Sequence, residues 1–189
     1  MAEATPTKVF LLHDERMQLH HPIGWNSNMT MEDAGFVYER PGRIAAIYNR
    51  LIDLEQRLRF RDIPKVPAST PQENVKTLNN FGHRRFIPID SDFCERSTIE
   101  LVHSPKHYEM IRRTCVLSDS ELEALGIDDL YFCHNTFHAS SLACGGVVKC
   151  VNAVTASQKS GANVPSRAIA LVRPPGHHAT REEAMGELW

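Results

Sequence analysis

Residues 168–178 are Ala-Ile-Ala-Leu-Val-Arg-Pro-Pro-Gly-His-His, and they give the clearest indication of the fold class. Five apolar residues in a row, 168–172, predict a strand buried on both faces, as in a parallel sheet. Pro174 and Pro175 end this strand because proline donates no ladder hydrogen bond. In an open parallel sheet, ligands bind beyond the carboxyl ends of the strands. His177 and His178 follow there, so the sequence predicts an α/β fold with a candidate site at this turn.

Helical and strand patterns alternate along the rest of the chain, as a parallel α/β sheet requires. Val9-Phe10-Leu11-Leu12 is a short continuous apolar run that predicts another buried strand. Apolar residues at helical spacing predict helices at 41–59 and 136–157, and Gly145-Gly146 in the second indicates a close backbone approach. Shorter elements are also expected: an edge strand at 86–89, a helical stretch at 97–113 broken near Ser104-Pro105, and a strand or turn at 130–133. A capping box of Ser118 and Glu121 begins another short helix, which Gly126 ends. Loops are expected at 20–36, 63–80 and 157–167.

The composition is that of an ordinary globular domain and disfavours several classes of protein. Hydrophobic residues make up 42% and charged residues 23% of the 189 positions, which suits one domain or a piece of a larger one. A net charge of −2 disfavours a basic nucleic-acid-binding protein, and Arg84-Arg85 is too small a basic patch. The five cysteines form no CxxC pair, so we expect free thiols in a reducing compartment. The N-terminus does not resemble a signal peptide, and no strongly apolar run approaches the ~20 residues of a membrane span, so we expect a soluble intracellular protein.

The adjacent imidazoles of His177 and His178 are suited to proton transfer. Histidine changes charge near neutral pH, and two neighbouring rings can divide the work, because one takes a proton while the other carries charge and tunes the first. A bare His-His pair is more often a surface or metal-coordinating pair. Here Pro174-Pro175 stiffens the turn and Gly176 lets the backbone bend, which favours a functional pair.

Other histidines are weaker candidates for a site. His103 and His107 are four residues apart in an expected helical stretch, as are His134 and His138, and this spacing can hold zinc. Neither pair has the glutamate of an HExxH motif, so ordinary polar positions are the favoured interpretation.

The remaining polar side chains give no stronger signal. His20-His21 lies in the long early loop, where solvated positions are modestly favoured over a substrate role. The cysteines have no identifiable base partner, which argues against a cysteine nucleophile. Asp119, Glu121 and Glu123 fit a solvated helix face rather than a pair of catalytic carboxylates.

The string Arg173-Pro174-Pro175-Gly176-His177-His178-Ala179 resembles the signature of the zinc-dependent histone deacetylases. Weaker matches occur in the family's order. They are Asp14 and Met17 at the first strand-to-loop step, Glu39, Pro41 and Arg43 at an HPExPxR element, Leu101-Val102-His103-Ser104 with Tyr108, and Tyr131 to Phe137 leading into Ala143-Cys144-Gly145-Gly146. Order and spacing are most similar to class II enzymes of the fungal type, and the resemblance extends from about Val9 to Gly186.

This resemblance implies the arginase/deacetylase fold, a parallel sheet with helices on both faces in three αβα layers. It implies hydrolysis of the acetyl-lysine amide with zinc as cofactor. His178 would be the general base and then the acid, with His177 as its electrostatic partner. Gly186 would begin a channel-lining step, and the loop with His20 and His21 would rim the substrate entrance. Acetylated histone tails or other acetyl-lysine proteins would be substrates and a corepressor complex a partner, in the nucleus and also the cytoplasm, without direct binding to nucleic acid or membrane.

The sequence also departs from the family pattern. The family's zinc ligands include an Asp-x-His pair after the channel glycine, and no Asp-x-His occurs here. Val37-Tyr38-Glu39 stands where the family has HPE. We therefore expect residues 1–189 to be the N-terminal part of a catalytic domain, with no metal ligands of its own and inactive in isolation. Two alternatives stay open: an acetylpolyamine-type amidohydrolase of the same superfamily, and a non-catalytic product that acts only through partner binding.

Overall fold

The computed structural model describes residues 8–26, 28–29, 40–61, 85–127, 130–160 and 167–184. Within these residues the sheet is parallel and has the strand order β2-β1-β3. Its strands are β1 (Val9–His13), β2 (Phe86–Ile89) and β3 (Ala168–Leu171). Leu11 is paired with Pro88 on one side and with Ile169 on the other. Pro88 has no N–H for a further neighbour, which agrees with the predicted place of β2 at an edge.

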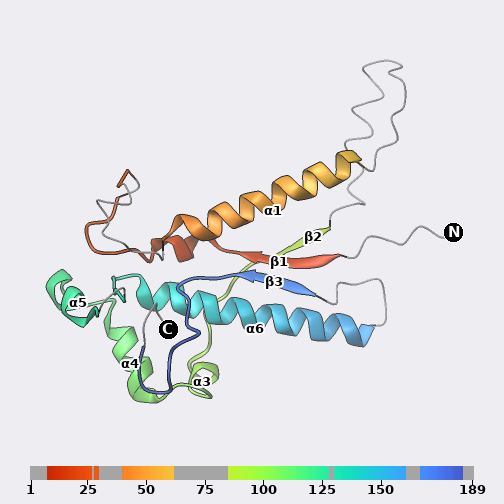
Figure 1. Ribbon diagram of the computed structural model, residues 1–189. Coiled ribbons are helices and arrows are strands. Elements are labelled where there is room, and N and C mark those ends of the chain that lie inside the picture. Colours follow the sequence, from red (N-terminus) through yellow and green to blue (C-terminus); the bar gives the residue numbers. More distant parts are fainter. Residues whose placement is uncertain are drawn as a thin grey trace.

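Two long helices cover opposite faces of this sheet, α1 (Gly42–Arg61) on one and α6 (Thr136–Ser160) on the other (Figure 1). The main core lies between the three layers. It contains Leu11, Leu12, Met17, Ile44, Leu142, Ala143, Cys150 and Leu171. The predicted three-layer αβα arrangement with a parallel sheet is therefore confirmed, and because all strands run the same way, their carboxyl ends meet at one edge.

The glycine pair in α6 permits the close approach that the sequence indicates. A methyl group on Gly145 would overlap the carbonyl oxygen of Asp92, and one on Gly146 would lie 2.9 Å from the methyl groups of Leu12. The helix therefore packs directly against β1 and against the segment that follows β2. α6 runs three residues beyond its predicted end, and α1 begins at Gly42 instead of Pro41 and ends at Arg61 instead of Arg59.

Shorter helices follow β2 and lie near the carboxyl ends of the strands (Figure 1). The predicted break near Ser104-Pro105 separates α3 (Arg96–Ile99) from α4 (Pro105–Arg113), and Ser104 caps α4. α5 (Asp119–Leu125) begins with the predicted capping box of Ser118 and Glu121. A 3-10 helix, η1 (Glu15–Leu19), was not predicted; the Asp14 side chain caps it by accepting from the backbone N–H of Arg16 at 2.9 Å. Residues 130–133 form no strand; Leu130 makes an isolated bridge with Ile127.

One helix among the described residues, α6, is long and apolar enough to cross a membrane by length and composition alone. The span Thr136–Lys159 has 24 residues, and an 18-residue window within it reaches a mean hydropathy of 1.2. Valines at 147, 148, 151 and 154 raise this mean without forming one strongly apolar run, so the expectation that no such run nears the length of a membrane span stands. The same composition suits a core helix, and α6 packs along the sheet in that way. The predicted loop at 63–80, Arg84, and the candidate residue Gly186 lie outside the described residues.

Candidate functional site

The two candidate histidines occupy the centre of a tight turn just beyond β3. The N–H of Ala179 donates to the carbonyl oxygen of Gly176 at 3.1 Å, which places His177 and His178 at the two central positions. Their ring centroids are 4.1 Å apart, and the rings are inclined at 68°. Both residues are exposed. The turn therefore presents two neighbouring imidazoles to solvent at the carboxyl edge of the sheet, where the sequence predicts a site.

The buried side chain of Arg173 holds the start of this turn. Its side chain is buried, with 1% of the residue exposed. Nη1 donates to the carbonyl oxygens of Met17, at 2.9 Å, and His20, while Nη2 donates to the hydroxyl of Tyr131 at 3.0 Å. One guanidinium thus joins the end of β3 to the end of η1 and to the segment before α6. The sequence identified Arg173 only through the motif; its partners lie 42 to 156 residues away and have no local signal.

His20 belongs to the support of the turn and not to a surface rim. It is fully buried, its ring stacks on Tyr131 with centroids 4.6 Å apart, and Nδ1 lies 3.2 Å from the hydroxyl oxygen of Thr136. Burial, and then the nearby charge of Arg173, hold the pKa of His20 well below its usual value, so its ring is neutral. A buried neutral ring does not contact a substrate at the entrance. The prediction that His20 binds substrate is therefore not supported, whereas the same prediction for the half-buried His21 stays untested.

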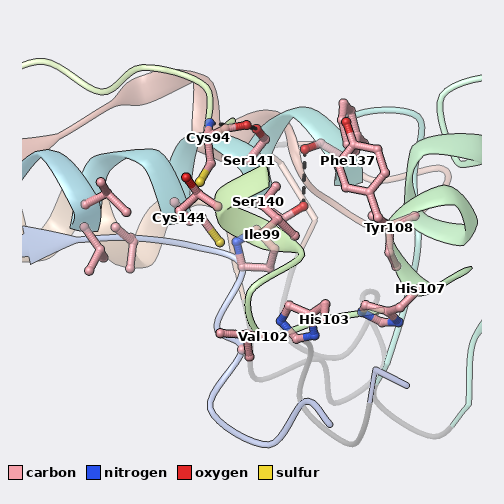
Figure 2. A pocket seen from close by; sticks show the side chains of 18 of the residues that line it. Cys94, Ile99, Val102, His103, His107, Tyr108, Phe137, Ser140, Ser141 and Cys144 are labelled. Carbon is pink, nitrogen blue, oxygen red and sulfur yellow. Dashed lines mark hydrogen bonds between the residues drawn. The ribbon is translucent and has the colours of Figure 1, made fainter. Parts of the chain in front are cut away.

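A cavity of about 410 Å³ lies beside the turn, between α3, α4 and α6 (Figure 2). Its lining is mainly apolar and includes Ile99, Val102, Tyr108, Ile111, Phe137, Val147, Val172, Pro174 and Pro175. Two thiols also line it, Cys94 and Cys144. Cys144 is an exposed residue, yet desolvation of its thiol by the apolar lining, and then Cys94, raise its pKa to about 11, so this thiol stays protonated near neutral pH. Two other thiols lie beside imidazoles, Cys133 Sγ at 3.6 Å from His20 Nδ1 and Cys115 Sγ at 4.0 Å from His138 Nδ1, so the expectation that no cysteine acts as a nucleophile stays a prediction.

In neither of the two weaker pairs do both histidines lie on one helix, because His134 precedes α6 and His103 precedes α4. His134 binds Asp119 through Nε2 at 3.0 Å, whereas the ring of His138 lies edge-on to Phe137 and Phe93. His103 lies before the cap of α4 and not on the same helix as His107, which corrects the helical spacing that the sequence indicated. The ring centroids of His103 and His107 are nevertheless 4.9 Å apart.

The described part of the chain does not fit a zinc ion. Among these residues, no three or more His, Cys, Asp or Glu side chains gather in a group that could hold a metal. We therefore derive no reaction step through a metal. What the described residues do provide is a pair of imidazoles, a buried guanidinium that holds them, and an apolar cavity beside them.

The chain is similar to known deacetylases along most of its length. Residues 38–186 match the family described as "Histone deacetylase domain". Histone deacetylase HDA1 of Saccharomyces cerevisiae is 34% identical over 186 residues, which is 96% of this chain and 23% of the yeast protein. Human polyamine deacetylase HDAC10 is 34% identical over 132 residues, 66% of this chain and 19% of that protein.

The fold comparison agrees with the sequence comparisons. The crystal structure of the HDA15 HD domain has a TM-score of 0.57 and 24% identity, and the match covers 96% of this chain and 40% of that one. This likeness concerns the fold alone. The chain thus spans about a fifth of the length of these two curated relatives. With the RPPGHHA turn placed beyond β3 and residues 38–186 matched, the chain belongs to the histone deacetylase family.

Proposed function

We propose that His177 and His178 are the proton-transfer pair of a deacetylase that hydrolyses the acetyl-lysine amide of histones or other proteins. The observation that carries this proposal is the exposed turn at the carboxyl edge of the sheet, with ring centroids 4.1 Å apart. General acid–base catalysis needs such a side chain within reach of substrate and water. Membership of the histone deacetylase family supports hydrolysis of an acetylated amine as the reaction.

The two imidazoles have distinct roles in this proposal. His178 accepts the proton of the attacking water as that oxygen bonds to the acetyl carbon, and later gives a proton to the leaving lysine amine. His177 stays beside it and stabilises the charge that His178 gains. The family resemblance implies zinc as the cofactor, although the described residues form no site for it.

Two relatives support different substrates. Histone deacetylase HDA1 matches over 96% of this chain, whereas polyamine deacetylase HDAC10 matches over 66% at the same identity. The longer match favours acetyl-lysine proteins over acetylpolyamines. Histones would be met in the nucleus, so we propose the nucleus as the place of action. The second candidate function is a non-catalytic one, in which this chain acts through a partner.

A hydrolysis assay and a metal measurement separate these functions. We would purify the 189-residue chain and the longest product of its gene, and offer each an acetyl-lysine peptide and an N-acetylpolyamine. We expect the longer product to hydrolyse the peptide and His178→Ala to reduce its rate by about 100-fold or more, while His134→Ala, a change at an exposed histidine elsewhere, leaves it unchanged. Full activity of His178→Ala contradicts the assigned role. A longer product with neither zinc nor activity supports the non-catalytic function.

A further inference from the structure

The segment that leaves the histidine turn is fastened to a part of the chain about 75 residues earlier. In Figure 1 the dark-blue segment beyond β3 descends to the level of α3 and α4. Four hydrogen bonds join it to the start of α4. They are His103 Nδ1 with the carbonyl oxygen of Thr180 (2.9 Å), Ser104 N with that of Arg181 (2.9 Å), Ser104 Oγ with Glu182 Oε2 (2.7 Å), and His107 Nδ1 with the carbonyl oxygen of Glu182 (3.1 Å).

These contacts require a proton on Nδ1 of both histidines. A carbonyl oxygen only accepts, so Nδ1 of His103 and Nδ1 of His107 must each carry the donating proton. Ser104 is used twice: its hydroxyl donates to Glu182 and accepts from the backbone N–H of His107 at 3.1 Å. The same serine thus caps α4 and holds the segment. We call His103, Ser104 and His107 the exit anchor.

The exit anchor stands on a rigid base. His107 is 1% exposed and Ser104 is 7% exposed. Pro105 occupies the first turn of α4, where its fixed backbone angle suits a helix start. Ile111 of the same helix packs in a second core cluster with Leu122 and Phe132. Movement of the anchor therefore requires movement of a packed helix.

The turn itself has no comparable burial. Gly176, His177 and His178 are all exposed, so core packing does not set the direction of the two rings. Their backbone is held before the turn by Arg173 and after it by the exit anchor. Beyond Ala179 the segment also closes on itself, because the N–H of Thr180 donates to the carbonyl oxygen of Glu183 at 2.9 Å. A fixed entry at Arg173 and a fixed exit at Thr180 together restrict the path of residues 174–179.

We propose that His103, Ser104 and His107 are positioning residues that hold the His177–His178 turn in place. This inference rests on the function proposed above, since it gives that site its second support. None of the three touches the reacting atoms; each acts through the backbone of residues 180–182. Catalytic groups lose rate when misplaced by about 1 Å, which is why such support matters.

The test is amide hydrogen exchange on the purified 189-residue chain. His107→Leu keeps the bulk of the side chain but removes the donor to the carbonyl oxygen of Glu182. We expect amides of residues 177–183 to exchange about 10-fold faster, while those of β1 and α6 stay unchanged. His107→Asn restores a donor near the position of Nδ1, so we expect it to bring exchange back to within about threefold of the starting chain. The matched control is His134→Leu, at an exposed histidine bound to Asp119.

The imidazole signals of His177 and His178 provide a second readout. In a proton–carbon correlation spectrum we expect the signals of both rings to shift in His107→Leu and to return to their original positions in His107→Asn. The reason is that an anchored backbone fixes the orientation of the two rings relative to each other. A folded His107→Leu chain with unchanged exchange and unchanged ring signals overturns the proposal, and so does exchange that rises equally in α6. If His107→Leu does not fold, His103→Leu at a half-buried position gives the decision by the same criteria. No readout uses hydrolysis, so failure of the longer gene product to hydrolyse the acetyl-lysine peptide would refute the proposed function without deciding the anchor.

Discussion

Replacing Arg173 by Met tests the support of the site most directly. The change removes a buried guanidinium that donates to the carbonyl oxygens of Met17 and His20 and to the hydroxyl of Tyr131. Each hydrogen bond from a charged donor contributes about 1.5–3 kcal/mol, and a buried acceptor that loses its donor costs about 1–3 kcal/mol. Methionine carries no charge, so the variant no longer has to keep a charged group away from water, and this offsets part of the loss of stability. We expect the free energy of unfolding to fall by about 3–5 kcal/mol, a large share of the about 5–15 kcal/mol of a typical domain.

Urea unfolding followed by circular dichroism measures this difference. Arg173→Lys keeps the charge but lacks the planar fork that reaches several acceptors at once, so we expect an intermediate loss of about 2 kcal/mol. The control is Arg112→Met, which removes an exposed arginine paired with Glu109 and is expected to leave the urea midpoint nearly unchanged, because exposed ion pairs contribute little to stability. If Arg173→Met unfolds at the same urea concentration as the unchanged chain, or if Arg112→Met lowers the midpoint as much, Arg173 does not support the turn in this way.

Three further predictions concern burial and close packing. Gly145→Ala places a methyl group against the Asp92 carbonyl, so thermal unfolding is expected to show a loss of about 1–3 kcal/mol, whereas Gly42→Ala, in open space, is expected to be neutral. The lowered pKa of His20 means that, in mildly acidic solution, the unfolded chain binds a proton that the folded chain does not. The contribution of His20 to stability is therefore complete above a pH of about 6.5, and the free energy of unfolding falls as the pH drops below that value. His20→Gln should flatten this dependence of the free energy of unfolding on pH, as urea titrations would measure it. Cys144, with a pKa raised to about 11, should react with iodoacetamide at pH 7.5 about 100-fold more slowly than a free thiol; equal rates in a mass-spectrometric time course would contradict this raised pKa.

Local patterns were sufficient to predict most of the elements. Three of these patterns depend only on residues close together in the chain: the apolar runs at 9–12 and 168–172 and the helical spacing at 41–59. Each of them forms the expected strand or helix in the structure. The capping box of Ser118 and Glu121 is equally local. The position of His177 and His178 beyond β3 followed from the prolines and from the direction that a parallel sheet imposes.

The contacts that hold the site were not predictable in this way. Arg173 reaches Met17 across 156 residues, and the exit anchor reaches residues 180–182 across 75 to 78. Hydrophobic periodicity along the sequence does not indicate such pairs, because they depend on how the layers of the fold pack against one another. The same reason explains the wrong expectation for His20, which was assigned to a solvated loop and lies instead beneath the turn, against Tyr131.

Burial divides the histidines of this chain into two kinds. Burial lowers the pKa of His13, His20 and His107, and each ring has a structural partner: His13 stacks on Tyr48 with centroids 4.3 Å apart, His20 stacks on Tyr131, and His107 holds Glu182. A neutral buried ring is a good donor and a good packing surface, but it exchanges no proton with a substrate. The pair at 177 and 178 is the opposite case, because its rings meet solvent while its backbone is held at both ends. The proton-transfer role proposed for this pair needs that combination, and His20 and His107, which contact Tyr131 and Glu182, help to supply it.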